Sequence, residues 1–138
     1  MMVLDTNVVS ELMRAQPASQ VLDWVNAQPS DQLCLCSVVV AELLYGVGRM
    51  PDDVRKSAML SAMQSMVLED FAGRVLSFDL DAAVAFAQMV VQREKMGRTI
   101  ATADAQIAAI CAAHGARLAT RNIRDFASLD LQLINPWD

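Results

Sequence analysis

Short apolar runs alternate with stretches of helical periodicity along the whole chain. The expected strands lie at residues 2–4, 33–36, 75–78, 117–120 and 131–134. The apolar spacing predicts helices at residues 6–13, 18–28, 38–47, 52–70, 79–96 and 102–114, and a turn or short helix at 122–126. Strands joined by helical crossovers pair in parallel, with helices on both faces of the sheet. The alternation therefore predicts an α/β fold with a mostly parallel, five-stranded sheet.

Capping and stop residues set the expected helix boundaries. Ser37 and Thr102 stand where a side chain can cap the following helix, and Asp79 or Asp81 can start the long helix that ends near residue 96. Gly97 and Gly115 follow two long helical stretches and are expected to end them.

Length and composition limit the class of protein. A chain of 138 residues favours one domain, expected over residues 1–138, and 54% hydrophobic content argues against disorder. No apolar run approaches the roughly 20 residues that span a bilayer, and the start of the chain lacks a signal-peptide pattern. We therefore expect a soluble, cytoplasmic protein without membrane contact. The three cysteines are odd in number and lie in apolar settings, so no disulfide is expected.

The formal net charge of −5 disfavours a broad nucleic-acid surface, which is normally basic. It does not exclude an enzyme that contacts a few phosphates and uses metal as its positive charge. The excess of acidic over basic residues favours a cationic partner, either a metal or a protein.

Three aspartates map to the edge of the sheet where ligands bind in open α/β folds. Asp5 follows the first strand directly, and Asp125 lies five residues after the fourth strand. Asp104 lies in the first turn of a helix, whose start points to the same edge. Taken singly, each fits a cap, a turn or a helix-dipole role about as well as a functional role.

Glu42 is harder to explain structurally. It is the only charged residue in an apolar helix that begins near Val38. Burial of a carboxylate is costly and demands a partner. Together with the three aspartates, Glu42 predicts a site for a hard divalent cation, which prefers carboxylate oxygens and activates water for phosphate chemistry. Without metal, the like charges should raise the pKa of one or more of these acids.

Four segments resemble motifs of the PIN-domain family, in order and along the whole chain. They are Val3–Leu12 around Asp5, Val40–Gly46 around Glu42, Thr102–Ala109 around Asp104, and Thr120–Phe126 around Asp125. The ending Ile134–Trp137 is similar to that of the toxin branch that includes FitB-like and VapC-like proteins.

The resemblance implies a three-layer α/β/α sandwich and an endoribonuclease that depends on Mg²⁺ or Mn²⁺. It also implies the toxin half of a type II toxin–antitoxin pair that acts on RNA, a homodimer, and a small antitoxin whose basic segment enters the acidic site. Asp5, Glu42 and Asp104 would be the primary metal-binding acids, and Asp125 a ligand through water or for a second metal.

Other residues are assigned roles around these acids. Thr6, Asn7, Thr120 and Asn122 are placed to orient the carboxylates, with capping and turn formation as an equal alternative.

Arg98, Arg121 and Arg124 are candidates for RNA phosphate contacts, although a solvated surface arginine is the simpler interpretation. Glu11 is expected to be exposed or paired with a basic neighbour.

Methionines recur at apolar helical positions in two long helices. They are expected in the core, with a dimer or antitoxin surface as the alternative. The methionines concerned are Met59, Met63, Met66 and Met89.

Two other functions stay open. A partner-binding module could keep the acids only to dock a basic peptide. An aspartate-based phosphotransferase or phosphatase also uses an aspartate after its first strand, but Asp5-Thr6-Asn7 lacks a second aspartate two residues on.

Overall fold

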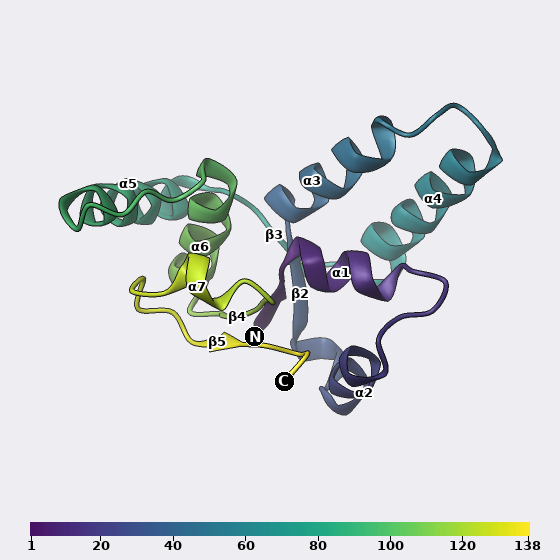
Figure 1. The fold of residues 1–138 in the computed structure, drawn as a ribbon, viewed down its shortest axis with the longest axis horizontal. Coiled ribbons are helices and arrows are strands. Elements are labelled where there is room, and N and C mark those ends of the chain that lie inside the picture. Colours follow the sequence, from purple (N-terminus) through teal and green to yellow (C-terminus); the bar gives the residue numbers. More distant parts are fainter.

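The five expected strands form one parallel sheet in the computed structural model, which describes residues 1–138 (Figure 1). They are β1 (Met2–Leu4), β2 (Leu33–Cys36), β3 (Val75–Leu76), β4 (Arg117–Ala119) and β5 (Leu133–Ile134). Their order is β3-β2-β1-β4-β5, and every pairing is parallel. The predicted fold class is confirmed. The two edge strands are two residues long, shorter than expected.

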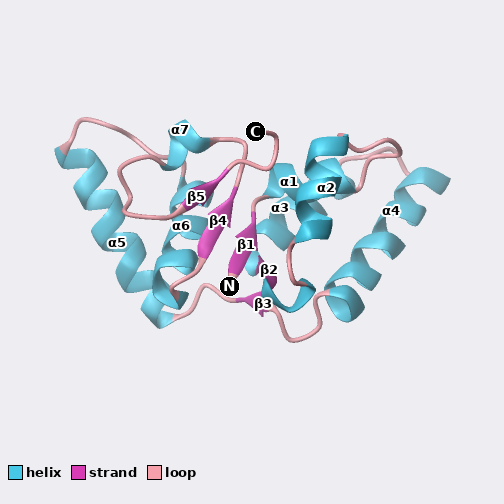
Figure 2. Ribbon diagram, turned by 90° about the horizontal axis from the view of Figure 1, so that it is seen from below, coloured by secondary structure: helices cyan, strands magenta, loops and turns pink.

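Helices connect successive strands as parallel pairing requires. They are α1 (Thr6–Leu12), α2 (Ser19–Ala27), α3 (Ser37–Gly48), α4 (Val54–Ser65), α5 (Leu80–Lys95), α6 (Thr102–His114) and α7 (Ile123–Phe126). A 3-10 turn, Ser30–Gln32, precedes β2, and a π-helical segment, Met66–Asp70, follows α4. The predicted helix 52–70 was therefore too long as an α-helix. Figure 2 shows the strands at the centre of the molecule, with α5 and α4 at opposite ends.

Two of the expected helix caps are wrong. α3 begins at Ser37 itself, and the Ser37 hydroxyl instead accepts a hydrogen bond from the backbone N–H of Phe78 at 3.3 Å. α6 begins at Thr102 with no side-chain cap. The Asp79 cap is confirmed, because its carboxylate accepts from Ala82 N at 2.9 Å. Gly97 and Gly115 adopt the left-handed backbone that ends α5 and α6.

The core lies on both faces of the central strands. β1 and β2 are buried along their whole length, as expected for parallel strands covered by helices on each side. Cys34, Cys36 and Cys111 are buried and unpaired, which confirms that no disulfide forms. No helix is both long and apolar enough to cross a membrane.

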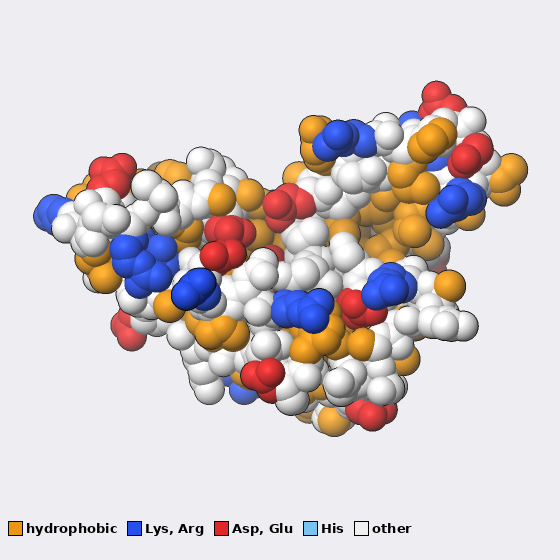
Figure 3. All heavy atoms as spheres, viewed as in Figure 1, with side chains coloured by type: hydrophobic (Ala, Val, Ile, Leu, Met, Phe, Trp, Pro, Cys, Tyr) orange, Lys and Arg blue, Asp and Glu red, His pale blue; other side chains and the backbone are white.

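Helices α3 and α4 form a projecting arm at one end of the molecule (Figure 1). At the tip of the arm, Lys56 Nζ contacts Asp52 Oδ1 at 2.8 Å and the carbonyl of Gly48 at 3.2 Å. Figure 3 shows hydrophobic side chains gathered on the side of α4 that faces α1. We call the hollow there the apolar groove. It measures about 750 Å³, and 12 of its 14 lining residues are hydrophobic, among them Leu12, Met59 and Met66.

Candidate metal centre

Asp5 lies at the carboxyl end of the central strand and caps α1. Its side chain is almost fully buried, at 3% exposure. Oδ1 accepts a hydrogen bond from the backbone N–H of Thr6 at 2.8 Å, and Oδ2 accepts from the Thr120 hydroxyl at 2.7 Å. Asp5 is therefore both a helix cap and a carboxylate held in one orientation.

Glu42 reaches the same edge from α3, where it is half-buried. The Thr6 hydroxyl donates to Glu42 Oε1 at 2.6 Å. Thr6 thus links the first two acids, with its backbone N–H on Asp5 and its hydroxyl on Glu42. The hydrogen-bond partner of the half-buried Glu42 carboxylate is therefore a neutral hydroxyl, which does not balance its negative charge.

Asp104 and Asp125 approach from the opposite side of the edge. Asp104 is half-buried in the first turn of α6, and Asp125 is exposed in α7. They line one pocket together. Neither carboxylate forms an ion pair within 4.0 Å.

The four acids are close enough to affect one another electrostatically. Burial, which is the largest cause, and the charges of Asp5, Asp125 and Glu42 together raise the pKa of Asp104 to about 6. Burial also raises the pKa of Asp5, against the opposing effect of its hydrogen bonds from Thr120 and Thr6. The edge therefore holds uncompensated negative charge. The sequence predicted this effect, a raised pKa for one or more of the acids when no metal is bound.

The donor chemistry of this edge suits a hard divalent cation. Carboxylate oxygens are the preferred ligands of such ions, and a bound cation would relieve the repulsion that raises these pKa values. No three acidic, His or Cys side chains, however, come close enough to form a complete ligand set. The residues fit a metal by type and charge, and binding would require their side chains to draw closer together.

A hydrogen-bond network surrounds Asp5. Besides donating to Asp5, the Thr120 hydroxyl accepts from the Asn122 backbone N–H at 3.0 Å. Asn7 Nδ2 lies 3.4 Å from both Asp5 Oδ2 and Thr120 Oγ1, and Asn7 Oδ1 accepts from Arg121 N at 3.2 Å. Thr6, Asn7 and Thr120 therefore contact the acids through side chains, whereas Asn122 acts here through its backbone.

The expected arginines take different positions. Arg98 Nη1 donates to the Ser128 hydroxyl at 3.1 Å, and Arg98 lines the pocket that holds Asp104. The Arg121 guanidinium lies 4.9 Å from the centre of the Trp137 ring, a cation–π contact.

Arg93 was not singled out from the sequence, yet it is 2% exposed and binds the carbonyls of Asp125 and Ala127, each at 2.7 Å. Its place among charged residues at the end of an amphipathic helix gave no signal of burial.

Glu11 was expected to be exposed or paired. It is buried at 8% exposure, so the exposed alternative is wrong. Its carboxylate pairs with Arg14 at 3.3 Å and accepts from Ala18 N at 3.0 Å, which stabilises the turn after α1.

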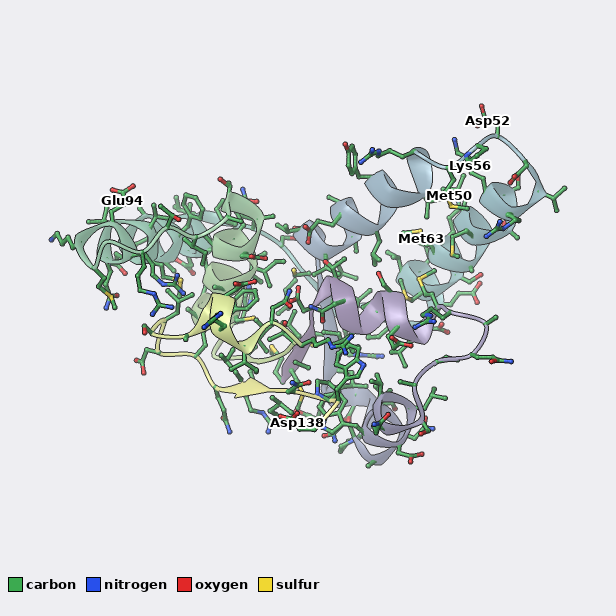
Figure 4. All side chains as sticks on the ribbon, in the orientation of Figure 1. Met50, Asp52, Lys56, Met63, Glu94 and Asp138 are labelled. Atoms are coloured by element: carbon green, nitrogen blue, oxygen red, sulfur yellow. The ribbon has the colours of Figure 1, made fainter.

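The methionines divide between the core and the arm. Met63 and Met89 are buried, as the core expectation required. Met59 and Met66 are half-buried and line the apolar groove. Met50 and Met63, labelled in Figure 4, line a second hollow that extends to Thr6 and Glu42, so the arm is continuous with the acidic edge.

Comparisons with known proteins find relatives that match along nearly the whole chain. A family model described as PIN domain matches residues 2–131. The VapC ribonuclease Y4jK of Sinorhizobium fredii is 44% identical over 138 residues, which cover 100% of this chain and 99% of that protein. Toxin FitB of Neisseria gonorrhoeae is 36% identical over 137 residues, 99% of each chain. The crystal structure of FitAcB from the same organism has a TM-score of 0.93 and 36% identity, and the match covers 99% of each chain.

Proposed function

The chain belongs to the PIN-domain family, and from this membership and its four acids we propose that it is a metal-dependent endoribonuclease. We further propose that it is the toxin of a type II toxin–antitoxin pair and acts in the cytoplasm. The observation that supports the chemistry most directly is the carboxyl edge of the sheet, where burial and the charges of neighbouring acids raise the pKa of Asp5 and of Asp104.

In this proposal Asp5, Glu42 and Asp104 hold the metal, and Asp125 binds it through water or holds a second ion. Carboxylate ligands favour Mg²⁺ or Mn²⁺. Such an ion, when bound, supplies the charge that activates water and stabilises the phosphate during hydrolysis.

The neighbouring polar residues fix the acids in place. The Thr120 hydroxyl and the Thr6 N–H hold the two oxygens of Asp5, which limits the rotation of its side chain. The Thr6 hydroxyl does the same for Glu42. Removing a group that orients a metal ligand in this way typically lowers metal affinity or activity by about 10- to 100-fold.

The substrate proposed is RNA. Arg98 and Arg121 lie near the acids and are exposed, so each is a candidate to bind a backbone phosphate. The Arg121 guanidinium is partly engaged by Trp137.

An antitoxin would contact two surfaces of different chemistry. The apolar groove, with Met59 and Met66 in its wall, suits the apolar face of a partner helix. A basic segment of the same partner would then reach the acids along the second hollow, which includes Glu42 and Met50. The net charge of −5 favours such a partner.

A homodimer is the proposed assembly of the chain. α3 exposes Leu44 and Tyr45, and α5 exposes Leu80 and Val84. On each of these helices the exposed apolar side chains offer a candidate interaction surface. Light scattering of the isolated chain checks this, and a monomer with wild-type cleavage would contradict it.

The second candidate is a docking module that binds a basic peptide without catalysis. It is favoured by one observation, the lack of a complete set of converged metal ligands. The phosphatase alternative gains no comparable support.

The test is cleavage of structured RNA by the purified chain with Mg²⁺ or Mn²⁺ and with chelator. We expect cleavage only with metal, and a loss of at least about a hundredfold in Asp5→Asn and Asp104→Asn. Asp31→Asn is the matched control, since it makes the same charge change at an exposed residue. Equal cleavage by all variants, or cleavage in chelator, would overturn the proposal. Binding of a basic peptide without cleavage would favour the docking module.

A further inference from the structure

A small polar pocket lies beside the acids, between the end of α5, the start of α6 and α7. Its volume is about 300 Å³. Three arginines, Arg93, Arg98 and Arg124, line it together with Asp104 and Asp125. These side chains carry a net positive charge, although the chain as a whole carries −5. The pocket is therefore a local basic site that directly adjoins the acidic one.

Arg93 is the buried member of this set. Nη2 donates to the carbonyls of Asp125 and Ala127, and Nη1 donates to Thr99 O at 3.4 Å. No carboxylate lies within 4.0 Å of its guanidinium, and its Nε is buried without a hydrogen-bond partner. A buried cation with an unused donor and no counter-ion favours an anion nearby.

Arg98 and Arg124 are the exposed members. Among side chains, Arg98 hydrogen-bonds only to the hydroxyl of Ser128, and the Arg124 guanidinium forms no hydrogen bond or ion pair. Their fork-shaped donors suit phosphate oxygens, which they can bind in bidentate fashion. They are free to close over an anion that enters the pocket.

We propose that this pocket binds a backbone phosphate of the RNA next to the phosphodiester that is cleaved, with Arg98 and Arg124 as its ligands and Arg93 as its positive floor. This rests on the proposed function. The acids and their metal would take the scissile phosphate, while the neighbouring phosphate would be repelled by the same acids unless a cation faced it. The arginines supply that cation beside Asp104.

The size of the pocket favours a single nucleotide unit over a helix of a partner protein. Ligand pockets span roughly 300–1,000 Å³, so a pocket of about 300 Å³ accepts a group the size of one sugar-phosphate unit. A helix of a partner protein needs a longer, apolar surface, which the groove beside α4 provides instead.

The first experiment measures cleavage of an oligoribonucleotide whose cleaved bond has been mapped with the wild-type chain. Arg98→Gln and Arg124→Gln are each expected to raise KM about tenfold with kcat little changed. Arg117→Gln is the control, because Arg117 is the first residue of β4 and lies at the amino end of the strands, away from the acids. Unchanged KM in both pocket variants would overturn the proposal.

The second experiment removes the charge from the substrate. A neutral methylphosphonate replaces the phosphate on the 5′ or the 3′ side of the cleaved bond. One of the two substrates is expected to lose about tenfold in kcat/KM with the wild type, and nothing further with the Arg98→Gln/Arg124→Gln double variant. If the wild type and the double variant lose equally, that phosphate binds outside the pocket. If neither the 5′ nor the 3′ methylphosphonate lowers kcat/KM of the wild type, the pocket holds no adjacent phosphate.

RNA binding in chelator separates failure of this proposal from failure of the proposed function. There the double variant should weaken binding and reduce the slope of log K against log salt by about 0.7 for the lost phosphate contact. If the wild type cleaves no RNA but this loss is seen, the nuclease proposal fails and the phosphate pocket stands. If the wild type cleaves RNA and the double variant binds and cleaves as the wild type does, only the pocket proposal fails.

Discussion

The carboxyl edge of the sheet and the apolar groove beside α4 differ in how their side chains are held. At the edge, Asp5 and Glu42 are fixed by hydrogen bonds of 2.6–2.8 Å from Thr6 and Thr120. In the groove, Met59 and Met66 meet other apolar side chains without directional contacts. The edge is ordered and charged, whereas the groove is lined by apolar side chains except for Arg55 and Asp70.

Each region therefore leaves a different free-energy cost uncompensated. The edge concentrates negative charge, which a bound cation relieves at neutral pH. The groove exposes apolar surface, which only an apolar partner can cover. Substitutions or ligands that affect one region and leave the other unchanged test whether the two regions are independent.

The largest effect on stability is expected for Arg93→Met, about 3 kcal/mol. The substitution leaves the carbonyls of Asp125 and Ala127 without their donor and so loosens the edge. Urea unfolding measures the change. Arg98→Met, at an exposed position, should stay within about 0.5 kcal/mol. Equal losses in both would show that Arg93 does not support the edge.

Metal should stabilise the edge without affecting the groove. At a concentration about a hundredfold above its Kd, Mg²⁺ or Mn²⁺ should add about 2.7 kcal/mol to the free energy of unfolding. Differential scanning calorimetry at pH 7 with and without chelator checks it. The gain should disappear in Asp104→Asn and persist in Met59→Gln. A melting temperature that ignores both metals in the wild type would contradict the metal centre.

Thr6→Val should lower metal affinity and cleavage about 10- to 100-fold, because it removes the hydroxyl that orients Glu42. Calorimetric titration with Mn²⁺ gives the affinity. Thr6→Ser keeps the hydroxyl and should restore most of it. If the serine variant is as weak as the valine variant, the hydrogen bond is not the cause.

Protonation of Asp104 should stabilise the metal-free chain as the pH is lowered from about 6 to about 4. The pKa of Asp104 rises on folding from 3.8 to about 6, so the folded state holds this proton more tightly than the unfolded state. This contribution to stability is present below about pH 4 and is lost as the pH rises through 6. It is on the order of 1 kcal/mol, because Asp104 is only half-buried and solvent screens its charge. Unfolding of Asp104→Asn in chelator should lack this part of the pH dependence.

The smallest effect on the isolated chain is expected in the groove. Met59→Gln should change the free energy of unfolding by less than about 1 kcal/mol and leave cleavage unchanged, because this half-buried side chain already borders solvent. Binding to a cognate antitoxin, measured by calorimetry, should weaken at least about tenfold. Unchanged binding would mean that the partner docks elsewhere.

Local patterns in the sequence were sufficient to predict the strands, most helix boundaries and the edge of the sheet at which the four acids lie. β1 and β2 could be predicted because parallel strands buried on both faces are continuous apolar runs. Asp79 and Gly115 could be assigned because a cap and a left-handed stop depend on the residue itself. Ser37 could not, because its hydroxyl is taken by Phe78, which is distant in the sequence.

The sequence by itself determined the parallel α/β fold and the presence of an acid at each relevant position, since periodicity and residue type are local properties. Only the tertiary structure decided how those acids are held. The link from Thr6 to Glu42 and the burial of Arg93 under α7 both join residues more than 30 positions apart. Such contacts depend on which elements pack together, and the free energy of packing is a property of the whole chain.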